Sequence, residues 1–129
     1  MTTVFTVKTD EGAYDLEASV RFVGQDVLVA IWGGEKPHIG AVSVAQPRAS
    51  LKNPEVISAT ASVICLPGHK EDELVKATSE ILAAALNTSV VVTAGIHWDN
   101  IDKEDIQEII ANSKILVDLI LETIVSFKR

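Results

Sequence analysis

Hydrophobic and polar residues alternate through the first half of the chain. Between Tyr14 and Phe22 every second residue is apolar and the residues between them are polar, which predicts a strand with one face in water. Other segments are typical of strands because of their apolar and β-branched residues and their glycine, proline or polar boundaries: 4–8, 27–32, 39–46 and 56–66. The segment 27–32 is apolar on both faces, so we expect it in the middle of a sheet or under a helix.

The periodicity becomes helical in the second half. An apolar stripe with acidic residues in its first turn predicts a helix that begins near Lys70 and ends at Asn87. The valine-rich segment 89–97 predicts a buried strand, and a second helix is expected from about Lys103 to Phe127. The predicted order is therefore five strands, a helix, a sixth strand and a second helix.

This order predicts an α+β fold with a mostly antiparallel six-stranded sheet and two long helices, in a single domain that spans residues 1–129. Short connections favour antiparallel neighbours among the first five strands. The fifth strand, the first helix and the sixth strand should form one right-handed βαβ crossover, whose two strands run parallel.

The predicted strand directions bring all three histidines to one end of the sheet. If the strand that ends at Trp32 runs upward, the turn that contains His38 lies at the top. The fifth strand then climbs back to the segment that contains His69, and the parallel crossover returns the sixth strand to the same end, at His97. We therefore predict that His38, His69 and His97 share one rim, although they are far apart in the sequence.

Each histidine lies in a segment whose residue types favour ligand binding. Glycines and a proline surround His38 in GGEKPHIG and allow close backbone approach. His69, in PGHKED, begins the first predicted helix, where free backbone N–H groups and Lys70 can bind an anion. His97, in GIHWDN, precedes the second helix. Acids on the same rim can orient the imidazoles or bind a cation: Glu35, Glu71, Asp72 and Asp99.

Composition and charge narrow the function classes. With 11 Lys plus Arg against 18 Asp plus Glu, the net charge of −7 opposes broad contact with a phosphate backbone, so we expect no nucleic-acid partner. The chain shows no secretion signal and no apolar stretch long enough to span a bilayer, so we expect no membrane role and a cytoplasmic location. The single Cys65 lies in an apolar run and is expected to be a small buried hydrophobe, which fits a reducing compartment.

The residues alone leave two kinds of site open. Three histidines have the ligand count of a catalytic zinc site, with Glu71 or Asp72 as the base, although no HExxH-like spacing supports it. Alternatively, the rim binds a small phosphorylated ligand, without the full phosphate-loop pattern GxxxxGKS/T. Trp32 and Trp98 can stack on a planar ligand, but such aromatics are more often core residues.

The second predicted helix is apolar on more than one face. An apolar stripe from Ile106 to Ile124 is widened by further apolar residues, so that the C-terminal half is apolar nearly all round. Such a helix is either enclosed within the domain or packs its surplus face on a second subunit. We favour the second interpretation and expect a homodimer.

Three segments together, GGEKPHIGAVSVAQPR, LPGHKEDELV and HWDNI, resemble the prenylated flavin chaperone family. Its members are small accessory subunits of prenylated-flavin-dependent decarboxylases that act on gallate and related hydroxyaryl acids. The resemblance covers nearly the whole chain and implies a fold like that of the proteasome assembly chaperones, which is often dimeric. The residues that match the family's motifs are Gly33, Gly34, Pro37, His38, Gly40, Gly68, His69, Lys70 and Glu71.

The resemblance implies that the protein handles prenylated flavin mononucleotide (FMN) for delivery to, or maturation in, a partner decarboxylase, and it assigns no catalytic residue. We therefore expect a non-enzymatic accessory protein whose histidine rim binds this flavin. In that hypothesis Lys70 and the N–H groups near His69 hold the phosphate, while His38 and His97 meet the ring system or the ribityl chain. The alternatives are a metal-dependent enzyme with His38, His69 and His97 as ligands, and a pure assembly chaperone that acts through its apolar last helix. The expected cofactor-binding residues are Gly33, Gly34, Pro37, His38, Gly40, Gly68, His69, Lys70 and His97.

Overall fold

The computed structural model describes residues 4–68 and 71–128, and it confirms the α+β fold and the predicted order of elements. The strands and helices are β1 (Val4–Lys8), β2 (Leu16–Val23), β3 (Asp26–Gly34), β4 (Ala41–Ala49), β5 (Ile57–Cys65), α1 (Asp72–Leu86), β6 (Val90–His97) and α2 (Lys103–Phe127). Several boundaries differ by a few residues from the prediction. β4, for example, continues through Pro47 to Ala49, because its neighbour β5 pairs with it along its whole length.

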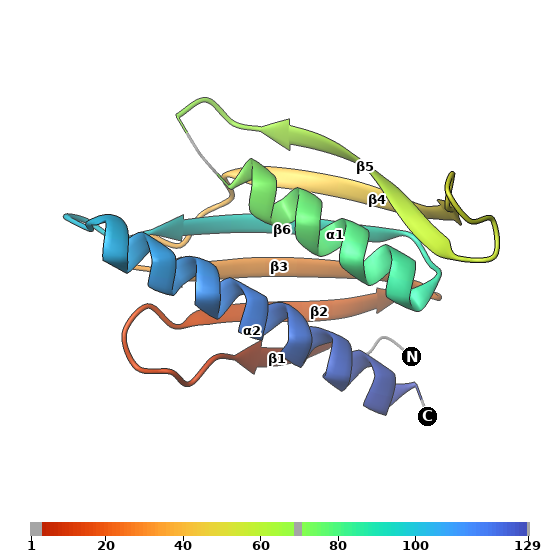
Figure 1. The fold of residues 1–129 in the computed structure, drawn as a ribbon. Helices are drawn as coiled ribbons and strands as arrows, with labels where there is room; N and C mark the ends of the chain where they lie inside the picture. Colours follow the sequence, from red (N-terminus) through yellow and green to blue (C-terminus); the bar gives the residue numbers. More distant parts are fainter. Residues whose placement is uncertain (1–3, 69–70, 129) are drawn as a thin grey trace.

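The six strands form one sheet in the order β1-β2-β3-β6-β4-β5, in which β3 and β6 are the parallel pair (Figure 1). Because β4 is antiparallel to both β5 and β6, β5 and β6 run in the same direction, as the crossover required. The expectation that β3 and β4 are neighbours is wrong, since β6 lies between them. The central position of β6 follows from its side chains, of which Val90, Val92 and Ala94 are fully buried.

Both helices cover the same face of the sheet, α1 mainly over β4 and β5 and α2 over β1 and β2 (Figure 1). The core lies between this face and the helices, and its largest fully buried side chains are Leu16, Ile31, Leu82, Leu116, Ile120 and Ile124. β3 lies in the middle of the sheet, as predicted, but only one of its faces is covered. On the other face Leu28 remains 37% exposed.

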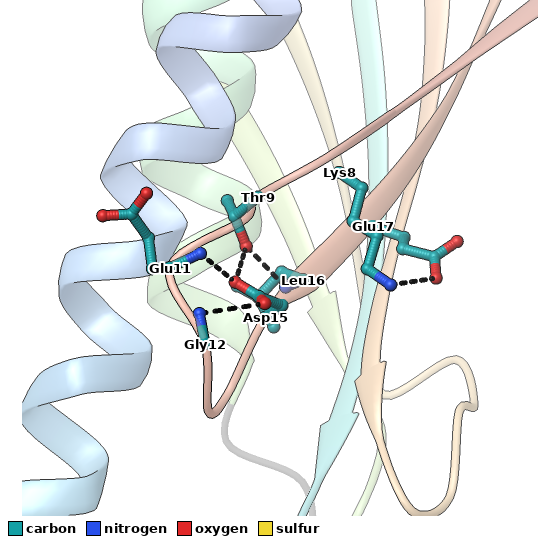
Figure 2. Close-up of polar contacts among 7 residues, drawn as sticks. All are labelled: Lys8, Thr9, Glu11, Gly12, Asp15, Leu16 and Glu17. Atoms are coloured by element: carbon teal, nitrogen blue, oxygen red, sulfur yellow. Dashed lines mark hydrogen bonds and ion pairs between the residues drawn. The ribbon is translucent and has the colours of Figure 1, made fainter.

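Local hydrogen bonds fix the loops that connect these elements. In the β1–β2 loop the Asp15 carboxylate accepts from the Thr9 hydroxyl (2.8 Å), the Glu11 N–H (2.9 Å) and the Gly12 N–H (3.2 Å), as Figure 2 shows. The Glu11 N–H and then the Thr9 hydroxyl hold the pKa of Asp15 below its ordinary value. The buried Asn112 of α2 donates to the Tyr14 carbonyl oxygen at 2.7 Å and so ties α2 to this loop.

The helix ends match their sequence signals. Asn87 ends α1 in the left-handed conformation, with φ of 53°. Asp102 begins α2 with a reciprocal capping box: its side chain accepts from the Asp105 N–H (2.9 Å), and the Asp105 side chain accepts from the Asp102 N–H (3.0 Å). The described part of the chain has no helix with both the length and the apolar character that crossing a bilayer requires.

Cys65 is exposed, and the expectation that it is a buried hydrophobe is wrong. β5 is the last strand of the sheet, and Cys65 is its last residue. Apolar neighbours in the sequence did not imply burial here, because a residue at the end of an edge strand has no further strand beside it to cover it.

Candidate functional site

β3 and β6 end at the end of the sheet where both helices begin (Figure 1). A cleft of about 700 Å³ opens there. The carboxyl ends of adjacent parallel strands are a common place for ligand sites in open sheets. The cleft is lined by Lys36, His38, Gly68, Glu71, Ile96, His97, Ile101 and Ile106. The structure thus brings together two of the three predicted histidines, whereas His69 and Lys70 lie outside the described residues.

Glu71, the residue that precedes α1, joins three parts of the cleft. Its Oε1 lies 3.2 Å from His38 Nε2 and accepts a hydrogen bond from the Ile96 N–H of β6 at 3.1 Å. Its side chain is only 10% exposed. Its carboxylate also packs against Gly40, where an added Cβ would overlap it. Glu71 therefore holds the His38 loop, β6 and the start of α1 in one arrangement.

The ring of His38 is fixed from both sides. Its Nδ1 lies 2.8 Å from the Lys36 carbonyl oxygen, which requires an N–H at that nitrogen, and its Nε2 faces the Glu71 carboxylate. The side chain of His38 is 25% exposed, so one part of the ring faces the cleft.

His97 and Asp99 form a second pair of imidazole and carboxylate, with His97 Nε2 and Asp99 Oδ1 2.8 Å apart. The Asp99 N–H donates to Glu35 Oε2 at 3.3 Å, and the Glu35 N–H donates to the His97 carbonyl oxygen at 2.8 Å. The hydrogen bond from His97 holds the pKa of Asp99 below its ordinary value, helped by contacts with Glu35 and Lys36. Thus Glu71 and Asp99 each face an imidazole and orient it, one of the two roles expected for the acids on the rim, whereas Glu35 bonds the Asp99 backbone instead.

Only part of the glycine-rich segment 33–40 lines this cleft. Gly33, Gly34 and Pro37 line a separate hollow of about 470 Å³, together with Trp32 and Trp98. Gly40 is buried against Glu71. Among the described residues of the predicted cofactor-binding set, only His38, Gly68 and His97 line the cleft itself. The segment 33–40 was expected to line one site, but its glycines Gly33 and Gly34 line one hollow and its histidine His38 lines the other.

Close backbone packing explains two of the glycines near the cleft. A Cβ on Gly34, which has φ of +92°, would overlap the carbonyl group of His97. A Cβ on Gly95 would overlap the carbonyl group of His38, so that β6 can approach the His38 loop only with glycine at this position. Sequence analysis did not identify Gly95, although a glycine inside a valine-rich strand is a signal of such close approach.

Sequence analysis also missed the other walls of the cleft. Lys36 places a cationic side chain there, and Ile96, Ile101 and Ile106 make its floor and sides apolar. Ile96 lies near the end of β6, Ile101 in the loop that follows and Ile106 in the first turn of α2. Of these, periodicity alone had placed Ile106 in the apolar stripe of the last helix. Of the tryptophans, Trp98 packs against the core and meets Tyr14 edge-on, with ring centroids 5.1 Å apart.

The described ranges 4–68 and 71–128 contain no group of three His, Cys, Asp or Glu side chains placed to hold a metal ion. His38 and His97 each face a carboxylate. The proposed third ligand of the metal alternative, His69, lies outside these ranges.

Comparisons with known proteins agree with this architecture. Protein LpdD of Lactiplantibacillus plantarum is 26% identical over 106 residues, which cover 78% of this chain and 71% of that protein. The fold is similar to that of a chain in the crystal structure of a chaperone complex for yeast 20S proteasome assembly, with a TM-score of 0.57, 15% identity, and coverage of 95% of this chain and 96% of that one. The family model for the prenylated flavin chaperone LpdD-like domain matches residues 10–125. The chain therefore belongs to the LpdD-like prenylated flavin chaperone family.

Proposed function

We propose that this protein is a cytoplasmic, non-enzymatic accessory protein that binds prenylated FMN in the cleft at the ends of β3 and β6 and assists a prenylated-flavin-dependent decarboxylase. Family membership supports the chaperone class. The observation that carries the flavin proposal is the convergence of His38, His97 and Lys36 on one cleft of about 700 Å³ with apolar walls. Sites of this volume, mostly apolar with a few convergent polar groups, are typical of cofactor binding.

Each end of the cleft suits a different part of the flavin. Lys36 and the start of α1, where no side chain of the described residues caps the helix, offer a cation and N–H donors for the phosphate. Lys70, which directly precedes Glu71, is proposed to join them. The rings of His38 and His97 can meet the ribityl chain or the ring system, because the adjacent carboxylates already fix their orientation.

Replacement of Lys36 by alanine is expected to weaken binding of FMN and of prenylated FMN about tenfold, because a hydrogen bond to a charged group contributes about 1.5–3 kcal/mol. The measurement is an anaerobic fluorescence titration of the purified protein with each flavin. Lys52→Ala, in the exposed β4–β5 loop, is the matched control and should bind as the wild type does. Failure of the wild type to bind either flavin below millimolar concentration would remove the proposed function.

We also propose that the protein is a homodimer, formed through the sheet face that neither helix covers. Across β3, β6 and β4, the paired residues Leu28, Val91 and Val44 form one row of this face. The next row along the strands is Ala30, Thr93, Val42 and Ile64. Leu28, Val44 and Ile64 are 37%, 44% and 69% exposed. These two rows on β3, β6, β4 and β5 carry no charged side chain, so this part of the face is complementary to a second copy of itself, and two such faces can stack as in a β-sandwich.

The replacement Val44→Asp is expected to convert the dimer to a monomer of 13.9 kDa without unfolding it, because Val44 is already partly exposed in the single chain. Light scattering after gel filtration measures the mass, and circular dichroism monitors the fold. Val125→Asp, on the exposed side of α2, tests the other surface that was expected to pack on a second subunit. Loss of the dimer in Val125→Asp, with Val44→Asp still dimeric, would assign the interface to α2 instead.

A further inference from the structure

A groove of about 520 Å³ runs between α1 and α2, separate from the polar groups of the cleft. It exists because the two helices lie over opposite halves of the sheet and contact each other little (Figure 1). Most of its exposed lining surface is apolar and comes from Leu74, Ala77 and Ile81 of α1 and Ile110 and Val117 of α2. The other lining residues are polar or charged: Glu73, Thr78, Ser113, Lys114 and Asp118. An apolar groove of this size is large enough for part of a ligand.

The groove is continuous with the cleft that holds His38 and His97. A third hollow, between the starts of the two helices, shares Glu71, Ile96 and Ile106 with the cleft. The same hollow shares Leu74, Ile110 and Ser113 with the groove. One path therefore leads from a polar end with histidines and Lys36 to an apolar end between the helices, and such a path fits an amphiphilic ligand.

Two features of the path indicate that a ligand covers it. Three large apolar side chains along its walls are about half exposed: Ile81 at 49%, Ile106 at 45% and Ile110 at 50%. Thr78, which also lines the groove, is 1% exposed, yet its hydroxyl has no hydrogen-bond partner among the described residues. A buried hydroxyl without a partner is unusual, and a polar atom of a bound molecule would supply the partner.

We propose that the groove between α1 and α2 binds the apolar, prenyl-bearing side of the flavin ring system, while the phosphate remains at the polar end near Lys36. This inference rests on the proposed function and adds to it the part of the site that distinguishes prenylated from plain FMN. Ile81 and Ile110 contact the added carbon atoms, and the Thr78 hydroxyl bonds a polar atom of the ring system. Plain FMN lacks the group that fills the groove, so it depends on the polar end alone.

The test compares two ligands across variants of exposed wall residues, which carry little risk of unfolding. In Ile110→Gln the affinity for prenylated FMN should fall about tenfold, while the affinity for plain FMN should stay within twofold, because only the former buries apolar carbon against this residue. The readout is the dissociation constant of each flavin from anaerobic titration. Val125→Gln changes an apolar residue of α2 outside the groove that is 43% exposed, against 50% for Ile110; it is the matched control and should change neither value.

The outcomes separate this inference from the proposed function. Equal losses for both flavins in Ile110→Gln, or no loss for either, would overturn the assignment of the groove while leaving flavin binding in the cleft intact. Absence of binding by the wild type would overturn both.

Thr78→Val tests the polar contact within the groove. This variant keeps the side-chain shape, so the protein without ligand should have a higher Tm, because a buried hydroxyl without a partner has been removed. Its affinity for prenylated FMN should nevertheless fall about threefold. An unchanged affinity would show that the hydroxyl does not contact the ligand.

Discussion

Replacement of Gly34 by alanine is expected to reduce the free energy of unfolding by roughly 4 kcal/mol, a large part of the total stability of a small domain. Two costs add at this position. An alanine there would adopt φ near +92°, which side chains rarely tolerate, and its Cβ would overlap the His97 carbonyl group. Because that carbonyl group belongs to backbone that is itself bonded to Glu35, it cannot move without breaking the end of β6. Urea unfolding followed by circular dichroism measures the loss.

Gly68→Ala is the matched control for this experiment. Gly68 has a similar φ of +81°, but within the described ranges no atom beyond its chain neighbours lies within 4 Å of the place that a Cβ would occupy. Its replacement should therefore cost only the backbone strain, about 1 kcal/mol. Similar losses in the two variants would show that the contact between Gly34 and His97 is not tight in solution.

The second large effect is expected for Glu71→Ala, with a loss of about 2–3 kcal/mol in the free energy of unfolding and at least a tenfold loss of affinity for prenylated FMN. The change removes the acceptor of the Ile96 N–H and the carboxylate that fixes His38, and it leaves space beside Gly40. The protein should lose stability and the cleft its geometry in the same variant, because the Glu71 side chain holds the His38 loop, β6 and the start of α1 together. Chemical unfolding and flavin titration measure the two effects.

Asp72→Ala provides the comparison, since it removes a neighbouring acid that is exposed at the first turn of α1. Its loss should be within about 0.5 kcal/mol, the magnitude of a charge at a helix terminus. Glu71→Gln should fall between the two, because an amide oxygen can still accept from Ile96 but leaves His38 without a carboxylate. If Asp72→Ala and Glu71→Ala weakened flavin binding equally, the general loss of negative charge, rather than the geometry around Glu71, would explain the result.

Most of the fold could be predicted from local pattern. Alternation identified β2, the change to a helical period located α1 and α2, and the position of Asn87 marked a helix end in the left-handed conformation. Strand order could not be predicted in the same way. The short connection between β3 and β4 allows the two strands to pair directly, but it also allows another strand to lie between them. The structure has the second arrangement, in which β6 lies between β3 and β4 with its core-facing side chains fully buried.

The candidate site was predictable only as far as strand direction determines it. Direction placed His38 and His97 at one end of the sheet, where they lie. It could not show which hollow a backbone segment lines, so Gly33 and Gly34 were assigned to the same hollow as the histidines although they line another. Nor could it show the groove between the helices, because the distance between two helices depends on how each packs on the sheet and not on the sequence of either alone.

The insertion of β6 between β3 and β4 also affects how the chain can fold during synthesis. The first five strands precede β6, so they can form a three-stranded unit, β1–β2–β3, and a separate β4–β5 hairpin before the central strand emerges from the ribosome. The edges of β3 and β4 that later pair with β6 are unpaired at that stage. Residue pairs such as Val27 and Val90 must then meet across a long stretch of sequence, and contacts of this kind slow folding. The nascent chain therefore passes through a stage in which two sheet edges are open to other chains, and arrival of the last third of the protein closes both at once.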